Sequence, residues 1–230
     1  MAKKEYVPME KQLIKLDQVR KNDKVKIYLE KANEQMNALG YTEHGFRHAG
    51  IVAGMARYIP VSLGLDPRLA ELAAISGYLH DIGNVINRKD HGELSAMLAY
   101  DILKEMGMDP AEIATIMGAI GNHEEELGCP ISSIGAALIL ADKADVHRSR
   151  VQNPNPLAFD IHDRVNHAVT HSQLRMDTEQ KSINLELTTD TQSASVMEYF
   201  EIFLLRMLMS RRAADFFGCK FKLIINGVEL

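Results

Sequence analysis

The sequence predicts a mainly α-helical protein, with a helical bundle followed by a small β-β-α-β unit at its C-terminal end. Two Asp-Pro pairs, Asp66-Pro67 and Asp109-Pro110, match the start of a helix, where the aspartate caps the helix and proline takes its first position. Apolar residues between and after these pairs recur at helical spacing. A cleanly alternating segment, Ser182–Thr188, occurs only near the end and is typical of a half-buried strand.

The helices follow in order along the first two thirds of the chain. Residues 9–39 carry apolar residues at helical spacing and predict one long or two shorter amphipathic helices, ended by Gly40. A second helix starts near Phe46, and the helix that Asp66-Pro67 begins is apolar nearly all round until His80-Asp81. Further helices are expected over about 92–106, from Asp109-Pro110 to about His123, and from about Ile131 through Asp142 towards Arg148.

The pattern changes after Asn153. Residues 165–176 predict a strand that pairs as a hairpin with 182–188 through 177–180. Residues 193–212 return to helical spacing, and 221–225 alternate again before the turn signal Asn226-Gly227. We therefore expect an N-terminal helical segment (1–40), a helical core (41–153) and an α+β C-terminal subdomain (154–230).

The composition is that of an ordinary globular protein, because 46% of the 230 residues are apolar and 25% are charged. The net charge of −5 gives no reason to expect nucleic-acid or anionic-membrane binding. No run of eighteen apolar residues predicts a membrane span, and the residues after Met1 do not resemble a signal peptide. With Cys129 and Cys219 expected as free thiols, we predict a cytoplasmic protein.

Six polar residues stand near helix ends on otherwise apolar faces, where unpaired polar groups are costly. Asp142 is the clearest case, because it follows the uninterrupted apolar run 134–141. A carboxylate there needs a salt bridge, to Lys143 or Arg148, or a bound cation. The full set is His48, His80, Asp81, His91, His123 and Asp142.

In order and rough spacing, this pattern resembles the HD superfamily of metal-dependent phosphohydrolases. The resemblance rests on a lone histidine (His48), the His80-Asp81 pair and a distant aspartate in the context Asp142-Lys143-Ala144-Asp145. His91 and His123 stand where some branches carry a second metal. With Asp145 and Arg148, the pattern is most similar to the bacterial branch that hydrolyses dinucleoside polyphosphates. It covers about residues 40–150 and implies a helical metal-binding fold there, but not over the first forty residues or the C-terminal subdomain.

The chemistry of these residues supports one or two divalent ions. His48, His80, Asp81 and Asp142 suffice for one metal, and His91 and His123 supply a second, with Asp81 as the bridge. Two ions ~3.5–4 Å apart can clamp a phosphate and lower the pKa of a shared water from about 15.7 towards 7. This mixture of imidazole and carboxylate donors does not distinguish Fe, Mn, Co, Ni and Zn.

A phosphoryl transition state also needs positive charge nearby. Lys143 and Arg148 are the first candidates, because both are expected on the helix of Asp142, and Arg47, Arg88 and Lys89 are weaker ones. We expect Asp81, Lys143 and Arg148 to take part in catalysis, and Lys143, Asp145 and Arg148 to contact substrate. Surface positions are expected for the remaining histidines, which are His44, His147, His167 and His171, the last two on one strand face. Glu124 to Glu126 are expected to form a solvated acidic turn.

The predicted function is hydrolysis of a phosphoester or phosphoanhydride bond, in a small phosphorylated substrate such as a nucleotide, by a metal-activated water. Two alternatives remain open. HD-type di-iron oxygenases use the same six ligands and would consume oxygen. A non-catalytic nucleotide sensor is the other, although such a module would be expected to have lost some ligands. The C-terminal subdomain could form a homodimer or cover the pocket.

Overall fold

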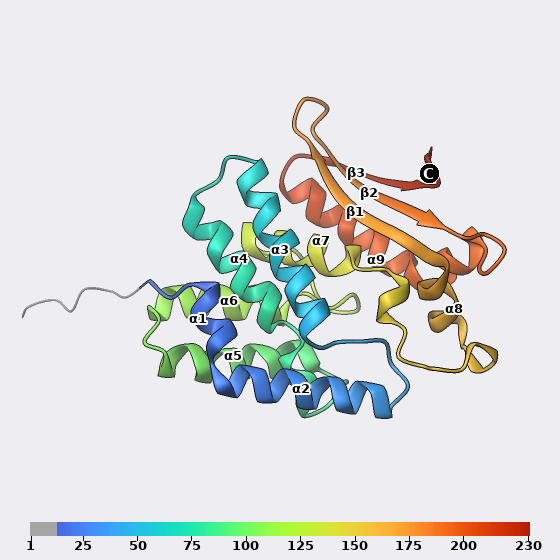
Figure 1. Cartoon of the computed structure of the whole chain (residues 1–230). Coiled ribbons are helices and arrows are strands. Elements are labelled where there is room, and N and C mark those ends of the chain that lie inside the picture. Colours follow the sequence, from blue (N-terminus) through green and yellow to red (C-terminus); the bar gives the residue numbers. More distant parts are fainter. Residues whose placement is uncertain (1–12) are drawn as a thin grey trace, which may run out of the picture.

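The structure, a computed structural model, describes residues 13–230, so the predictions for the first twelve residues lie outside the described part. Seven helices in this part form a bundle. Figure 1 shows the sheet and α9 packed on the upper right of the bundle, away from α1 and α2. The mainly helical fold class with a C-terminal sheet is confirmed. The bundle consists of α1 (Leu16–Lys21), α2 (Asp23–Ala38), α3 (Phe46–Ser62), α4 (Pro67–Leu79), α5 (His91–Glu105), α6 (Pro110–Gly121) and α7 (Ser133–Ala144).

The predicted helix starts are confirmed by their caps. The Asp66 side chain accepts a hydrogen bond from the Arg68 amide at 2.6 Å, and Asp109 accepts one from the Ala111 amide at 2.8 Å. Near the N-terminus, two shorter helices form, because the chain leaves the helix at Asn22 and this side chain caps α2. Gly40 follows α2 with a φ of +82°, a conformation that glycine adopts without a steric penalty.

Helices α3 and α4 form a closely packed antiparallel pair, which Figure 1 shows at the centre of the bundle. Gly77 permits the close approach, because a Cβ atom there would lie 3.0 Å from backbone atoms of Ala53. The antiparallel arrangement places the first turn of α3 beside the last turn of α4. It therefore brings His48 next to His80-Asp81, although 32 residues separate the two histidines.

Helix α7 is shorter than the sequence predicted. It ends at Ala144, because the next residue, Asp145, leaves helical geometry with a ψ of 76°. The short 3-10 helix η2 (Arg148–Arg150) follows. The prediction that Arg148 shares the helix of Asp142 was therefore wrong.

The C-terminal part contains helix α8 (Ile161–Ala168) and a four-stranded sheet covered by α9 (Val196–Phe216). The predicted strand over 165–176 was wrong at its start, because residues 165–168 belong to α8, which Asp160 caps through a 2.8 Å bond from the Asp163 amide. The hairpin is confirmed, with antiparallel β1 and β2, and β3 pairs parallel to β2. The strands are β1 (Val169–Asp177), β2 (Ser182–Thr189), β3 (Lys220–Ile225) and β4 (Val228–Glu229).

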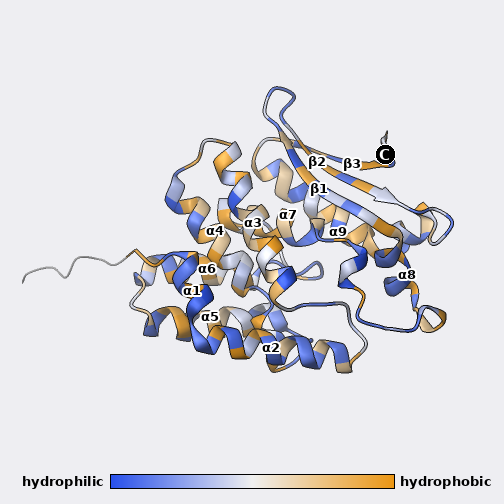
Figure 2. Cartoon of the chain, viewed as in Figure 1, coloured by the Kyte–Doolittle hydropathy of each residue, from blue (hydrophilic) through white to orange (hydrophobic). Residues whose placement is uncertain are grey.

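One continuous hydrophobic core joins the bundle to the sheet and α9. Figure 2 shows hydrophilic residues over much of α1 and α2, interrupted by apolar residues, as amphipathic surface helices require. Over residues 13–230, no helix combines the length and apolarity needed to cross a bilayer. The shared core fixes α9 against α7, which carries Asp142.

Candidate metal centre

The six predicted donors converge in the bundle from five separate segments. His48 belongs to the first turn of α3, His80 and Asp81 follow α4, and His91 begins α5. His123 follows α6, and Asp142 occupies the last turn of α7. All six side chains are buried, although each is polar or charged. Their concentration at one place is costly unless they share a cation.

Three of the donors form a compact group. The Nε2 atoms of His48 and His80 lie 3.2 Å apart, and Asp142 Oδ1 lies 3.3 Å from the first and 3.5 Å from the second. One divalent ion could be held by these three atoms. His80, Asp81 and His123 form a second such group.

Asp81 lies between these donors and points one oxygen to each side. Its Oδ2 atom lies 3.5 Å from His48 Nε2 and 3.4 Å from His80 Nε2, whereas its Oδ1 atom lies 3.2 Å from His91 Nε2. The His123 ring stands 5.0 Å from the His80 ring and 5.1 Å from the His91 ring, measured between centroids. Asp81 therefore lies where a carboxylate that bridges two ions would lie.

A second layer of contacts fixes the orientation of the four imidazoles. In each ring, Nδ1 lies against an oxygen that accepts hydrogen bonds, so Nδ1 would keep its proton while Nε2 offers its lone pair to a metal. The four pairs are His48 with Asp145 Oδ2 at 2.7 Å, His80 with the Gly77 carbonyl at 2.9 Å, His91 with Glu124 Oε1 at 2.7 Å, and His123 with the Ile120 carbonyl at 2.6 Å.

The donor set fits a metal, because lone pairs face one another across its centre. The Nε2 atoms of His48 and His80 and the Asp142 carboxylate all present acceptors, an arrangement that needs a positive charge between them. Burial and Arg150 oppose protonation of His48, but hydrogen bonds to Asp142 and Asp145 outweigh them and raise its pKa. Without a metal, a proton thus takes part of the role of the cation.

The pKa values of His91 and His123 shift in opposite directions. Burial opposes protonation of His91, but Asp81 and Glu124 outweigh it and raise the pKa to about 9. Burial and the neighbouring His80 lower the pKa of His123 to about 3. In the metal-free protein at neutral pH, His91 therefore holds a proton that a metal must displace, whereas His123 is already neutral.

Lys143 is buried and binds two carboxylates. Its Nζ lies 2.7 Å from Asp142 Oδ2 and 2.8 Å from Glu125 Oε1, so the predicted salt bridge to Asp142 forms while Oδ1 faces the histidines. Arg206 of α9 also binds Glu125 Oε1, through Nε at 3.0 Å. Although burial raises the pKa of Glu125, Lys143 and Arg206 lower it further, to about 2. Sequence reasoning missed this chain of ion pairs, because Glu125 and Arg206 are 81 residues apart.

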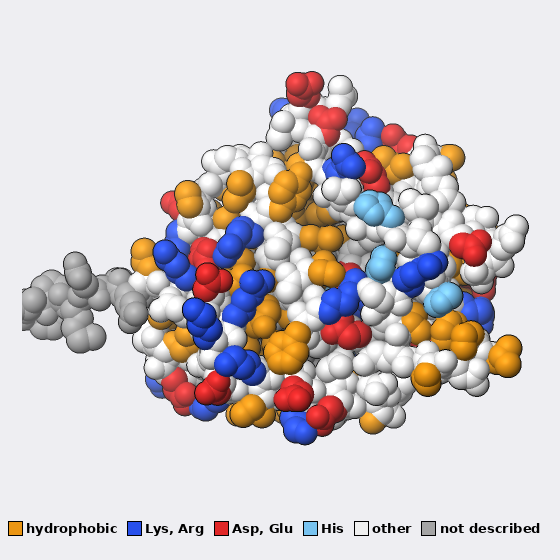
Figure 3. Space-filling view, viewed as in Figure 1, with side chains coloured by type: hydrophobic (Ala, Val, Ile, Leu, Met, Phe, Trp, Pro, Cys, Tyr) orange, Lys and Arg blue, Asp and Glu red, His pale blue; other side chains and the backbone are white. Residues whose placement is uncertain are grey.

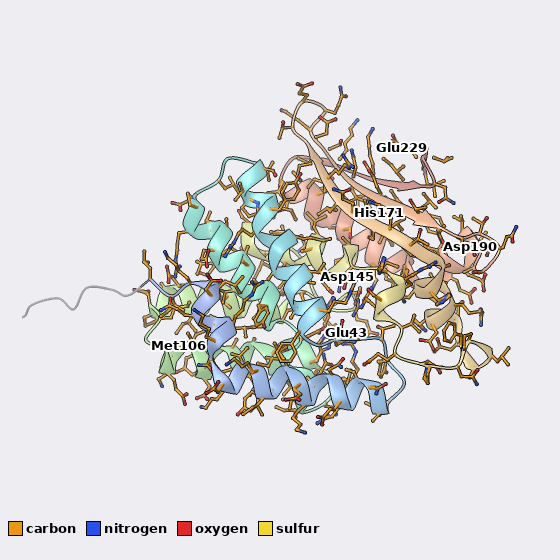
Figure 4. The ribbon with its side chains drawn as sticks, in the orientation of Figure 1. Glu43, Met106, Asp145, His171, Asp190 and Glu229 are labelled. Carbon is orange, nitrogen blue, oxygen red and sulfur yellow. The ribbon has the colours of Figure 1, made fainter. Side chains whose placement is uncertain are left out.

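Asp145 is held by two arginines and is 2% exposed. Arg47 binds it through both Nη atoms, at 2.9 and 3.1 Å, and Arg150 donates to its carbonyl at 3.0 Å. Figure 4 shows Asp145 beside the start of α3, close to Glu43. Its position fits the orientation of His48 better than the predicted contact with substrate. Arg148, the other predicted substrate contact, is exposed, whereas Arg150 is buried.

Several residues expected at the surface are not there. His44 is buried, and its ring stands 5.6 Å from the His48 ring, so the surface position predicted for it was wrong. The acidic turn is only partly solvated, because Glu124 binds His91 and the Gly92 amide. His167 belongs to α8 and therefore does not share a strand face with His171.

A small cavity of about 240 Å³ lies between α3 and β1, and Asp145 is part of its lining. Arg47, His147 and His171 contribute to its lining. In Figure 3, histidine, basic and acidic side chains gather on this face of the molecule. Lys89, a weaker candidate for phosphate contact, lies exposed in the loop before α5.

A cavity of about 490 Å³ adjoins the donors. His44 and Arg88 connect it to them, because the His44 ring contacts His48 and Arg88 Nη1 lies 3.3 Å from His91 Nε2. Its lining comes from the loop before α3, the loop before α5, the acidic turn, α8 and α9, and includes Tyr41, His44, Arg88, Glu125, Arg150 and Arg206. The six donors themselves do not line the cavity, so a small molecule in it would be separated from them by side chains such as His44 and Arg88.

The chain is similar to two known proteins and matches one family model. An uncharacterized protein of Methanocaldococcus jannaschii is 28% identical over 195 residues, which cover 74% of each chain. The crystal structure of a predicted HD superfamily hydrolase from an uncultured Thermotogales bacterium aligns at 24% identity and a TM-score of 0.44, over 58% of this chain and 75% of that one. The family model of the HD domain matches residues 43–191, from the loop before α3 to the end of the β1–β2 hairpin. The chain belongs to the HD domain family.

Proposed function

We propose that this HD-domain protein is a metal-dependent hydrolase that cleaves a phosphoester or phosphoanhydride bond. The proposal rests on one observation, the convergence of the Nε2 atoms of His48 and His80 and the Asp142 carboxylate within 3.5 Å, each held by a second contact. That arrangement is built to hold a divalent cation. The neighbouring cavity, with Arg88, Arg150 and Arg206 in its lining, supplies a place for an anionic substrate.

The donors would hold one or two divalent ions, Fe, Mn, Co, Ni or Zn. When bound, such ions neutralise developing charge on a phosphoryl group and lower the pKa of water. The residues of the chain perform the remaining tasks. Asp81 and Asp142 supply negative charge, and burial excludes bulk water. Arg88 offers a cation at the cavity wall, where its Nη1 atom lies 3.9 Å from Asp81 Oδ1.

The size and lining of the cavity favour a substrate no larger than a mononucleotide. A cavity of about 490 Å³ falls within the usual range for small-molecule sites, roughly 300–1,000 Å³. Tyr41 is 45% exposed and offers an aromatic face at the rim. The resemblance to dinucleoside polyphosphate hydrolases depends in part on Arg148, which is exposed, so those larger substrates are the less favoured proposal.

A phosphatase screen of the metal-loaded protein tests the proposal. Purified protein would be loaded separately with Mn, Co, Ni, Zn and Fe, and assayed for phosphate release from mononucleotides, dinucleoside polyphosphates and simple phosphate esters. We expect D81N to lower turnover by roughly 100-fold or more, because even outer-shell changes cost 10–100-fold. D215N, at an exposed position on α9, is the matched control.

Three outcomes would contradict the proposal. Turnover that persists in D81N, with the fold intact, would show that the donor set is not used. No phosphate release over the whole panel, together with oxygen consumption by the iron-loaded protein, would favour the oxygenase. Nucleotide binding without either reaction would favour the sensor.

A further inference from the structure

The cavity beside the donors is closed on one side by a helix that lies outside the family match. The match ends at residue 191, whereas α9 spans Val196–Phe216. Three neighbouring residues of α9, Ile202, Phe203 and Arg206, contribute to the lining. This wall is therefore an addition of the C-terminal part of the chain to the HD domain, and Arg206 is its cation.

Two contacts fix the Arg206 guanidinium from below and from one edge. Its Nε donates to Glu125 Oε1 at 3.0 Å, and its Cζ lies 5.0 Å from the centre of the Phe203 ring. Phe203 is 4% exposed and thus forms a fixed base. Within residues 13–230, no acceptor lies at hydrogen-bonding distance from Nη1 or Nη2 of Arg206. Both donor groups remain available, although the side chain is only 18% exposed.

Several cations stand on the inner wall near these free donors. Glu125 is shared between Arg206 and Lys143, so one carboxylate faces two cations. Arg150 adds a third buried cation to the lining. The two other acids of the lining, Glu126 and Asp160, are exposed, where solvent screens their charge. Lys143 and Arg150 each face a further acid, Asp142 and Asp145, so the free Nη groups of Arg206, and not a net charge of the wall, favour an anion there.

We propose that Arg206 binds an anionic phosphoryl oxygen of the substrate through Nη1 and Nη2, and that Glu125 positions it. The proposal rests on the proposed phosphohydrolase function. A guanidinium suits the task, because two parallel N–H groups match two oxygens of a phosphate. Arg88 stands near His91 on another part of the lining, so an anion in the cavity would meet arginines from two segments.

The position of Arg206 also places the bound anion near the donors. Glu125, which holds Arg206, binds Lys143, and Lys143 binds Asp142 at 2.7 Å. A phosphate on Arg206 is thus one carboxylate and one ammonium away from the first group of metal donors. The C-terminal subdomain would thus form part of the substrate site. Through Arg206 it would favour substrates that carry negative charge.

The competing interpretation is structural, with Arg206 tying α9 to the acidic turn through Glu125 and touching no ligand. Binding of methylphosphonate separates the two interpretations, because this anion carries a phosphonate group and its P–C bond resists hydrolysis. Calorimetry would compare the metal-loaded wild type, R206Q, R206K and R212Q. R212Q removes an exposed arginine of the same helix and is the matched control.

We expect R206Q to weaken methylphosphonate binding by about tenfold or more, since hydrogen bonds to charged groups are among the strong ones. R206K should fall between wild type and R206Q, because it keeps the charge and loses the paired donors. R212Q should bind as the wild type does. With a turned-over substrate, the loss should appear mainly in KM. Thermal unfolding of each variant reports the structural contribution separately.

Equal affinity of R206Q and wild type, or no measurable binding by the wild type, would overturn the proposal. A lower unfolding temperature of R206Q at unchanged affinity would establish the structural interpretation instead. Failure of the proposed function looks different. In that case no phosphate ester is hydrolysed by any metal form, and the dependence of methylphosphonate binding on Arg206 still decides whether this anion site exists.

Discussion

Asp145 Oδ2 lies 2.7 Å from Nδ1 of His48, on the side of the ring opposite to the metal donors. The contact fixes the tautomer of His48, since an ionised carboxylate only accepts hydrogen bonds. Arg47 and Arg150 in turn hold Asp145. Burial opposes ionisation of Asp145, but His48 and Arg150 outweigh it and lower its pKa.

Removing the charge of Asp145 should therefore weaken metal binding without removing a ligand. We expect D145N to lower the affinity for the first metal by about 10–100-fold, the usual cost of losing a second-layer partner. Competition with a fluorescent chelator measures this affinity. D101N, at an exposed position on α5, serves as the control. An unchanged affinity in D145N would show that the contact does not orient His48.

Metal binding at the side of His91 should depend on pH. Because the pKa of His91 is raised to about 9, a metal that binds there below pH 9 must displace a proton. The apparent affinity should then rise by about tenfold per pH unit up to about pH 9, and level off above it. His123, with a pKa near 3, contributes no proton in this range. Calorimetry in two buffers of different ionisation enthalpy counts the protons, and release of none at pH 7 would refute the prediction.

The close approach of α3 and α4 should be sensitive to one methyl group. G77A places a Cβ 3.0 Å from backbone atoms of Ala53, so the helices must separate, at a cost of about 1–3 kcal/mol. The same separation should lower the affinity for metal, because His48 and His80 lie on opposite members of the helix pair. G50A is the control on α3, since a Cβ there meets nothing within 4 Å. We expect G50A to be neutral or slightly stabilising.

Glu125 should contribute stability that acid removes. Its pKa is about 2 in the folded protein and 4.5 in its unperturbed state, so its contribution is complete above pH 4.5 and falls as the pH drops towards 2. At pH 7, E125Q should lose about 3 kcal/mol, because it leaves Lys143 and Arg206 without their shared partner. The difference in unfolding free energy between wild type and E125Q should narrow between pH 4.5 and 2. E126Q, at the exposed neighbouring position, should show neither effect.

Much of the fold could be predicted from local patterns, and so could the six buried polar residues that converge in the bundle. The Asp66-Pro67 and Asp109-Pro110 caps fixed two helix starts, and strand alternation placed the β1–β2 hairpin. The donors could be found because a buried polar residue at a helix end interrupts an apolar pattern. Asp142, after eight apolar residues, is such a case.

Two of the errors share a physical cause, which is dependence on distant partners. Nothing local distinguishes Arg150 from Arg148, and only the carbonyls of Glu43 and Asp145 decide which arginine is buried. Glu125 looked like part of a solvated turn, because its partner Arg206 arrives from another element. The error over residues 165–168 has a local cause, because the Asp160 cap starts a helix there and outweighs the strand preference of Val165.

The contribution of α9 to the cavity wall has a consequence for how this chain divides. The segment shared with the HD family contains every proposed metal donor, yet it stops short of α9. A chain trimmed to that segment would keep the reactive centre and leave one flank of it bare to bulk water. The family match therefore ends before the proposed substrate site does. Relatives that differ after residue 191 could differ in the substrates that they bind.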